Sequence, residues 1–233
     1  KIPLGVEMSL PTRGYLYPEL NTELFSRCLK TLEIDPALDE AQSLAITVIN
    51  QTLKFQYFNA LHWDYIETER KADVVIAPAN GLMAEALAHY SGAKKIIMYD
   101  INPNNIKFKQ HLYENYVGDY KNFYQDYARQ QGIEIEPKAD LSRSNVKWGE
   151  TQDVIDHWAA IKTLEKEYIC GDLISIVDTI VEKIEHNSII HTSTILGFYI
   201  FSNILHDRSE ILEAVDKIQK RVNETDSLWL GER

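Results

Sequence analysis

The chain has 233 residues, of which 45% are hydrophobic and 25% are charged, and its formal net charge is −11. This length and composition are typical of a globular protein with one domain and a substantial core. The negative charge disfavours nucleic acid as a partner, because an acidic surface repels phosphate backbones.

Cysteine spacing and apolar runs narrow the class of protein further. Cys28 and Cys170 lie far apart and neither belongs to a CxxC pair, so we expect no metal site and no disulfide framework. No run approaches the roughly 18 apolar residues of a membrane span, and no signal peptide is recognisable. We therefore predict a cytoplasmic protein without membrane attachment. The chain begins with Lys1 rather than Met, so it could be part of a larger chain. A homo-oligomer is also consistent with the sequence.

The first 70 residues predict a mostly helical N-terminal cap, which precedes an α/β domain over residues 71–233. Helices are expected at residues 21–32 and 39–57, on either side of a break at Asp35-Pro36. An aromatic loop before them contains Tyr15 and Tyr17. These two side chains are expected either to line a substrate pocket or to anchor the loop.

The segment from residue 72 to residue 105 carries most of the functional information. Its pattern predicts a buried strand at 74–77, a turn at 78–81, a helix at 82–90 that stops at Gly92, and a second strand at 95–99. Asp100 follows that second strand directly. Ligands of open α/β sheets bind beyond the carboxyl ends of the strands, so Asp100 is the first candidate for a ligand contact.

Residues 103–166 predict a helical insertion. Asn102 is suited to cap the helix that starts at Pro103 and runs to about Gln131, with a kink expected at Gly118. Aromatic and apolar residues recur every three or four positions along it, which indicates a core-facing stripe rather than a cofactor contact. A further helix is predicted over residues 151–166.

The remainder of the chain predicts three strands that alternate with two helices. The strands are expected at 167–170, 188–196 and 227–230, and the helices at 174–185 and 207–222. Asp207 and Glu210 have the spacing of a capping box. Together with the first two strands, this alternation predicts an α/β, Rossmann-like, mostly parallel sheet with helices on both faces.

Residues 72–105 resemble the first cofactor-binding motif of class I S-adenosylmethionine-dependent methyltransferases. In that family a strand, a glycine-rich turn and a helix precede a strand that ends in an acidic residue. Asp100 takes the position of the acid that binds the ribose, while Pro78, Asn80 and Leu82 take the usual glycine positions. Gly81 is the one glycine in the turn and is displaced by one position.

The resemblance implies a binding site for S-adenosylmethionine. The cofactor-binding residues it implies are Ala77, Pro78, Ala79, Asn80, Gly81, Asp100, Ile101, Asn102, Asp172 and Leu173. Asp172 would contact the adenine amino group, although it is also well suited to cap the helix that follows. His191 would act as a general base near the methyl acceptor, although a histidine of the core is the alternative.

Three functions remain open on the sequence. The first is transfer of a methyl group from S-adenosylmethionine to a small molecule or a protein. The second is a non-catalytic interaction module that keeps the methyltransferase-like fold, which the reduced number of glycines favours. The third, a nicotinamide-dependent oxidoreductase, requires a GxGxxG turn for the pyrophosphate, and this chain has APANGL instead.

Overall fold

The computed structural model describes residues 70–79, 81–100, 103–118, 120–131, 154–193 and 206–231. The predicted N-terminal cap, with Tyr15 and Tyr17, lies outside these ranges. The same holds for Asn80, Ile101 and Asn102 among the predicted cofactor-binding residues. The predicted division of the chain at residue 70 therefore stays a prediction.

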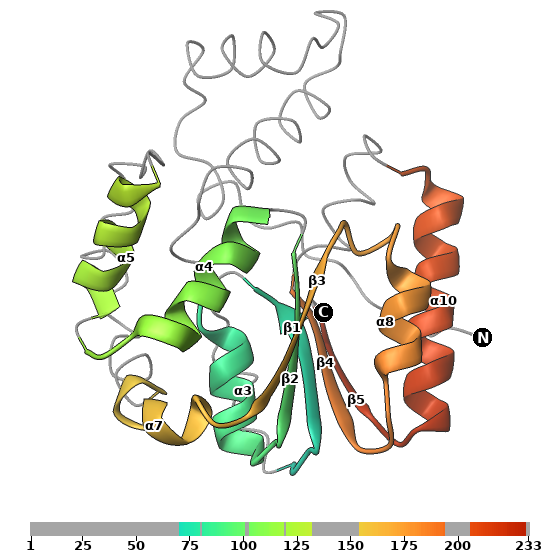
Figure 1. Ribbon diagram of the computed structural model, residues 1–233. Helices are drawn as coiled ribbons and strands as arrows, with labels where there is room; N and C mark the ends of the chain where they lie inside the picture. Colours follow the sequence, from blue (N-terminus) through green and yellow to red (C-terminus); the bar gives the residue numbers. More distant parts are fainter. Residues whose placement is uncertain are drawn as a thin grey trace, which may run out of the picture.

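Five parallel strands form one sheet in the order β3-β2-β1-β4-β5 (Figure 1). Their bounds are β1 Val74–Pro78, β2 Lys95–Asp100, β3 Glu165–Cys170, β4 Ser188–Ser193 and β5 Leu228–Gly231. Helices connect successive strands, as parallel pairing requires. The predicted α/β, Rossmann-like sheet is confirmed.

Helices cover both faces of the sheet (Figure 1). One face carries α3 (Met83–Ser91), α4 (Pro103–Asn115), α5 (Tyr120–Gln130) and α7 (Trp158–Ile161), and the other carries α8 (Val177–Lys183) and α10 (Arg208–Glu224). Strand β1 supplies both cores, because Val75 and Ala77 pack into one hydrophobic cluster and Val74 and Ile76 into the other. A strand buried on both faces reads as a continuous apolar run, which is why the sequence located β1 well.

The helix predicted from residue 103 to about residue 131 is two helices in the structure. Helix α4 ends at Asn115 and α5 begins at Tyr120. Gly118 lies between them with φ of 138°, a backbone conformation that side chains disfavour. The predicted kink is therefore a full break. The aromatic stripe is a core feature as predicted, since Phe108, Tyr116 and Tyr127 are buried.

The helix predicted over residues 151–166 was extended too far. Strand β3 begins at Glu165, two residues earlier than predicted. The sequence did not predict its first residues as strand because they are charged. In the structure Glu165 and Glu167 both form ion pairs with Lys95 of the neighbouring strand, at 3.1 and 3.2 Å. Strand β3 lies at one edge of the sheet, where charged side chains are common and protect against unwanted strand pairing.

Helix α8 begins later than predicted, whereas α10 begins at the predicted capping box. Helix α8 begins at Val177 rather than at residue 174, because residues 173–176 form a turn before it. Helix α10 has the predicted capping box. The Asp207 side chain accepts a hydrogen bond from the Glu210 amide, and the Glu210 side chain accepts one from the Asp207 amide.

Candidate functional site

The strand order places the candidate site at the carboxyl edge of β1, β2 and β4. The chain passes from β1 through β2 to β3 on one side and then returns to pair β4 with β1 on the other side. In open parallel sheets this reversal opens a crevice between the connections, and ligands bind there. Asp100, the last residue of β2, lies at this edge.

The turn from β1 to α3 forms one side of the candidate site. The Ala79 amide donates a hydrogen bond of 2.8 Å to the Tyr99 carbonyl, which continues the pairing of β1 with β2 beyond Pro78. Gly81 has φ of 59°, in the left-handed region that favours glycine. The displaced glycine of the sequence motif is therefore the residue that this turn requires.

Asp100 is buried, with 6% of its surface exposed. The Asn105 side-chain amide donates a hydrogen bond of 3.0 Å to Asp100 Oδ2. Asn105 belongs to the first turn of α4 and is itself 2% exposed. Helix α4 therefore fixes the orientation of the carboxylate at the end of β2.

A buried ion pair lies behind the turn. Lys109 of α4 and Glu85 of α3 have fully buried side chains, and Lys109 Nζ lies 2.5 Å from Glu85 Oε1. Lys109 Nζ also donates a hydrogen bond of 2.6 Å to the Gly81 carbonyl, and Tyr113 donates one of 3.1 Å to Glu85. Burial lowers the pKa of Lys109, while the carboxylates of Glu85 and Asp100 oppose that shift.

Asp172 reaches the same edge of the sheet through β3. The amide of Gly171 donates a hydrogen bond of 2.9 Å to the Asp100 carbonyl. The Asp172 carboxylate accepts hydrogen bonds from the amides of Ile174 and Ser175, at 3.1 and 3.0 Å. These bonds hold the turn at residues 173–176, whereas the N-cap of α8 is Ile176 and has no side-chain hydrogen bond, so the predicted helix cap at Asp172 is wrong. Its contact with adenine stays a prediction.

His206, which the sequence analysis did not single out, also contacts the Asp172 carboxylate. His206 Nε2 lies 2.9 Å from Asp172 Oδ1, and His206 Nδ1 lies 3.5 Å from Glu210 Oε2. Burial acts to raise the pKa of Asp172, but the hydrogen bonds from Ser175 and His206 outweigh it and hold the pKa below its usual value. Asp172 is thus an ionised carboxylate within its own turn at neutral pH.

His191 lies in β4, with 7% of its surface exposed. The Tyr99 hydroxyl reaches across β1 and donates a hydrogen bond of 2.9 Å to the His191 carbonyl. The pairing of β4 with β5 shifts register between His191 and Ser193, an irregularity that often re-aims side chains next to binding sites. The burial agrees with a histidine of the core, and the role as general base stays a prediction.

The other described residues of the predicted site are mostly buried. Ala77, Ala79 and Leu173 have 0%, 1% and 2% of their surface exposed, and Leu173 packs into the hydrophobic cluster under α8 and α10. These three residues have no polar side chain, so any hydrogen bond from them to a ligand involves the backbone. Within the described ranges, no three His, Cys, Asp or Glu side chains are grouped to hold a metal ion. Among the described helices, none combines the length and apolar character of a membrane-spanning segment.

Sequence reasoning missed Glu85, Asn105 and Lys109. A signal for each was present. Glu85 is the one acidic residue of α3, and the residues on either side of it are alanines. Asn105 and Lys109 are four positions apart, so they share a face of α4 with Leu112. A charged residue on an apolar helix face predicts a buried partner, and that inference was available from the sequence.

Comparisons with known proteins leave the assignment to the site itself. Neither protein-family models nor curated proteins nor solved structures gave a match to this chain. The fold and the arrangement of residues at the carboxyl edge therefore carry the functional argument.

Proposed function

We propose that the chain binds S-adenosylmethionine and is a methyltransferase that acts on a small molecule or a protein. One observation carries the proposal. The buried carboxylate of Asp100 ends β2 beside the β1–α3 turn, one strand away from the point between β1 and β4 where the order of the parallel sheet reverses. A carboxylate in this position can accept hydrogen bonds from both hydroxyls of a ribose, which orients the nucleoside.

The chain offers complementary groups for the rest of this cofactor. Helix α3 has nine residues and begins after Leu82, whose side chain cannot cap it, so its first amides and the positive end of its dipole suit the carboxylate of the methionine part. When bound, S-adenosylmethionine supplies an electrophilic methyl group. The protein then has to hold the acceptor in line and, for a hydroxyl acceptor, to remove a proton, a role we assign to His191.

A non-catalytic module is the second candidate. It is favoured by Asp172, whose two carboxylate oxygens both bind groups of the chain itself. A nucleotide amine would have to compete with these hydrogen bonds. A nicotinamide-dependent oxidoreductase ranks below both, because the turn has one glycine where a pyrophosphate needs close backbone approach at several.

Calorimetric titration with S-adenosylhomocysteine tests the proposal. We expect binding with micromolar affinity by the parent chain and a loss of at least about 1.5 kcal/mol, roughly tenfold, in Asp100→Ala, because the change removes a charge-assisted hydrogen bond. Asp216→Ala, at an exposed position of α10, is the control and should bind as the parent does. NADH serves as the competing ligand.

The outcomes separate the candidates. Unchanged affinity in Asp100→Ala would remove this residue from the site. Binding of NADH in place of S-adenosylhomocysteine would favour the oxidoreductase. If the folded parent binds neither ligand, the non-catalytic module becomes the better account, and transfer of a labelled methyl group need not be assayed.

A further inference from the structure

The proposed chemistry does not use the Lys109–Glu85 ion pair, although burying these two charges has a large desolvation cost. Both side chains are fully buried between α3 and α4. Taking each charge out of water costs several kcal/mol, and a pair of apolar side chains of similar volume is often equally or more stable. Stability of the contact between the two helices therefore does not account for this pair, and its position in the fold suggests another role.

The Lys109 ammonium is connected to both halves of the candidate site. On one side it binds the carbonyl of Gly81, within the turn between β1 and α3, at 2.6 Å. On the other side its charge acts on Asp100, whose carboxylate is held by Asn105 one helical turn earlier on α4. Glu85 balances the ammonium and anchors it to α3.

We infer that Lys109 is a positioning residue for the ligand-binding edge, which fixes Gly81, in the turn between β1 and α3, relative to Asp100. This turn has one glycine, at a left-handed φ, and its amides continue the pairing with β2 for a single hydrogen bond after Pro78. The bond from Lys109 to the Gly81 carbonyl supplies a restraint from the other side. The part of this inference that concerns a ligand rests on the function proposed above.

The test uses a variant that removes both charges. Lys109→Met alone leaves Glu85 buried without its counter-charge, a change that destabilises a fold strongly. Glu85→Gln combined with Lys109→Met removes the pair as a whole and is expected to fold. Lys107→Met, at an exposed position on the same helix, is the matched control.

Amide hydrogen exchange of the ligand-free chain measures the restraint directly. We expect exchange of the hydrogen-bonded amides of Ala79 and Ala86, on either side of the turn, to be at least about tenfold faster in the double variant than in the parent, and exchange in α10 to be unchanged. A general loss of stability would instead accelerate both regions. Equal exchange at Ala79 and Ala86 in the parent and the double variant would overturn the inference.

Titration with S-adenosylhomocysteine forms the second arm. We expect the double variant to bind at least about tenfold more weakly than the parent while its thermal midpoint stays close to that of the parent, and Lys107→Met to match the parent in both. Parent-like affinity in the double variant would overturn the positioning role. If the parent itself binds no S-adenosylhomocysteine, the proposed function fails, and the exchange measurement still decides whether Lys109 restrains the turn.

Discussion

Two aspartates at the carboxyl edge of the sheet illustrate how neighbours set the role of a carboxylate. Asp100 receives a side-chain hydrogen bond from Asn105 and lies in the field of Lys109. Asp172 is surrounded by two backbone amides and His206, as is usual for a residue that caps a turn. The same residue type thus ends a strand beside the candidate site in one place and holds a local turn in the other.

The structural role of Asp172 predicts a dependence of stability on pH. Its folded-state pKa lies below the ordinary value of 3.8, so ionised Asp172 stabilises the fold above that pH, and the contribution is lost as the pH falls through the folded pKa. We expect Asp172→Asn to lower the free energy of unfolding by about 1 kcal/mol at pH 7, because Asn lacks the charge and one of the two accepting oxygens of Asp172. The deficit should shrink by pH 3.

Urea unfolding of both proteins at pH 7 and pH 3 checks this expectation. His206, which contacts Asp172, and Glu210, which contacts His206, are unchanged in the variant. An equal difference in unfolding free energy at the two pH values would show that the charge of Asp172 does not contribute.

At the scale of elements, the sequence predicted those whose signals are local. Strand β1 is a continuous apolar run, α3 ends at a glycine, and α10 begins with a capping box, and all three lie where predicted. Strand β3 and the gap between α4 and α5 depend on tertiary context. Strand β3 can carry charged residues because it lies at the edge of the sheet. The aromatic stripe continues across Gly118, although the helix ends before it.

The candidate site follows the same division. Asp100 was predictable because it directly follows a recognisable strand. The contacts of Lys109 with Gly81 and Glu85 join residues 28 and 24 positions apart, and they form only when α4 packs beside α3. Single-sequence patterns carry no information about such distances, although a charged residue on an apolar helix face marks where to look.

The end of α3 provides a prediction at this scale. Gly92 has φ of 73° and ψ of 27°, and its amide donates to the carbonyls of Ala88 and His89. A Cβ at this position would meet no atom within 4 Å, so the cost of a side chain is one of backbone conformation alone. We expect Gly92→Ala to lower the unfolding free energy by about 1 kcal/mol, and Gly92→Asn by less, since Asn tolerates this conformation.

Thermal and chemical unfolding of the two Gly92 variants test this account. The order parent, then Gly92→Asn, then Gly92→Ala is the expected ranking of stability. Equal losses in both variants would show that the left-handed conformation does not set the cost, and an Ala variant as stable as the parent would contradict the left-handed cap.

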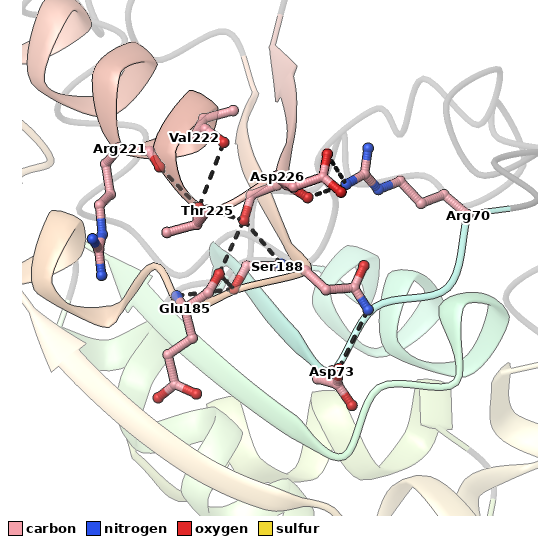
Figure 2. A network of polar contacts seen from close by, with 10 residues as sticks. Arg70, Asp73, Glu185, Ser188, Arg221, Val222, Thr225 and Asp226 are labelled. Carbon is pink, nitrogen blue, oxygen red and sulfur yellow. Dashed lines mark hydrogen bonds and ion pairs between the residues drawn. The ribbon is translucent and has the colours of Figure 1, made fainter.

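At the scale of the whole molecule, the two edges of the sheet carry different kinds of polar group. The candidate ligand contacts lie at the carboxyl edge. Around the amino-terminal ends of β4 and β5, a polar network links residues that are distant in sequence (Figure 2). In it, Arg70 pairs with Asp226, and the Asn187 side-chain amide donates to Asp73 at 3.3 Å. This network joins the segments that lead into β1, β4 and β5, at the opposite ends of the strands from Asp100.

Ser227 is central to that network. Its hydroxyl oxygen accepts a hydrogen bond of 3.0 Å from the amide of Ser188, which is fully buried, and its hydroxyl donates one of 3.0 Å to the Glu185 carbonyl. Ser227→Ala leaves the buried Ser188 amide without this partner, whereas the Glu185 carbonyl keeps a hydrogen bond of 2.9 Å from the Ser188 hydroxyl. Because an unsatisfied buried group costs about 1–3 kcal/mol, we expect the unfolding free energy to fall by an amount in that range.

The polar network lies at the amino-terminal ends of the strands and the candidate site lies at their carboxyl ends. We therefore expect Ser227→Ala to affect stability alone. Amide exchange at Ala79 and Ala86 should accelerate only to the extent that global unfolding does, and affinity for S-adenosylhomocysteine should equal that of the parent below the unfolding transition. The double variant at Glu85 and Lys109 is expected to show the opposite pattern, with a small change in stability and a large change at the turn. If Ser227→Ala loosened the turn selectively, the two edges would be coupled through the sheet, and the amino-edge network would have to be counted as part of the site.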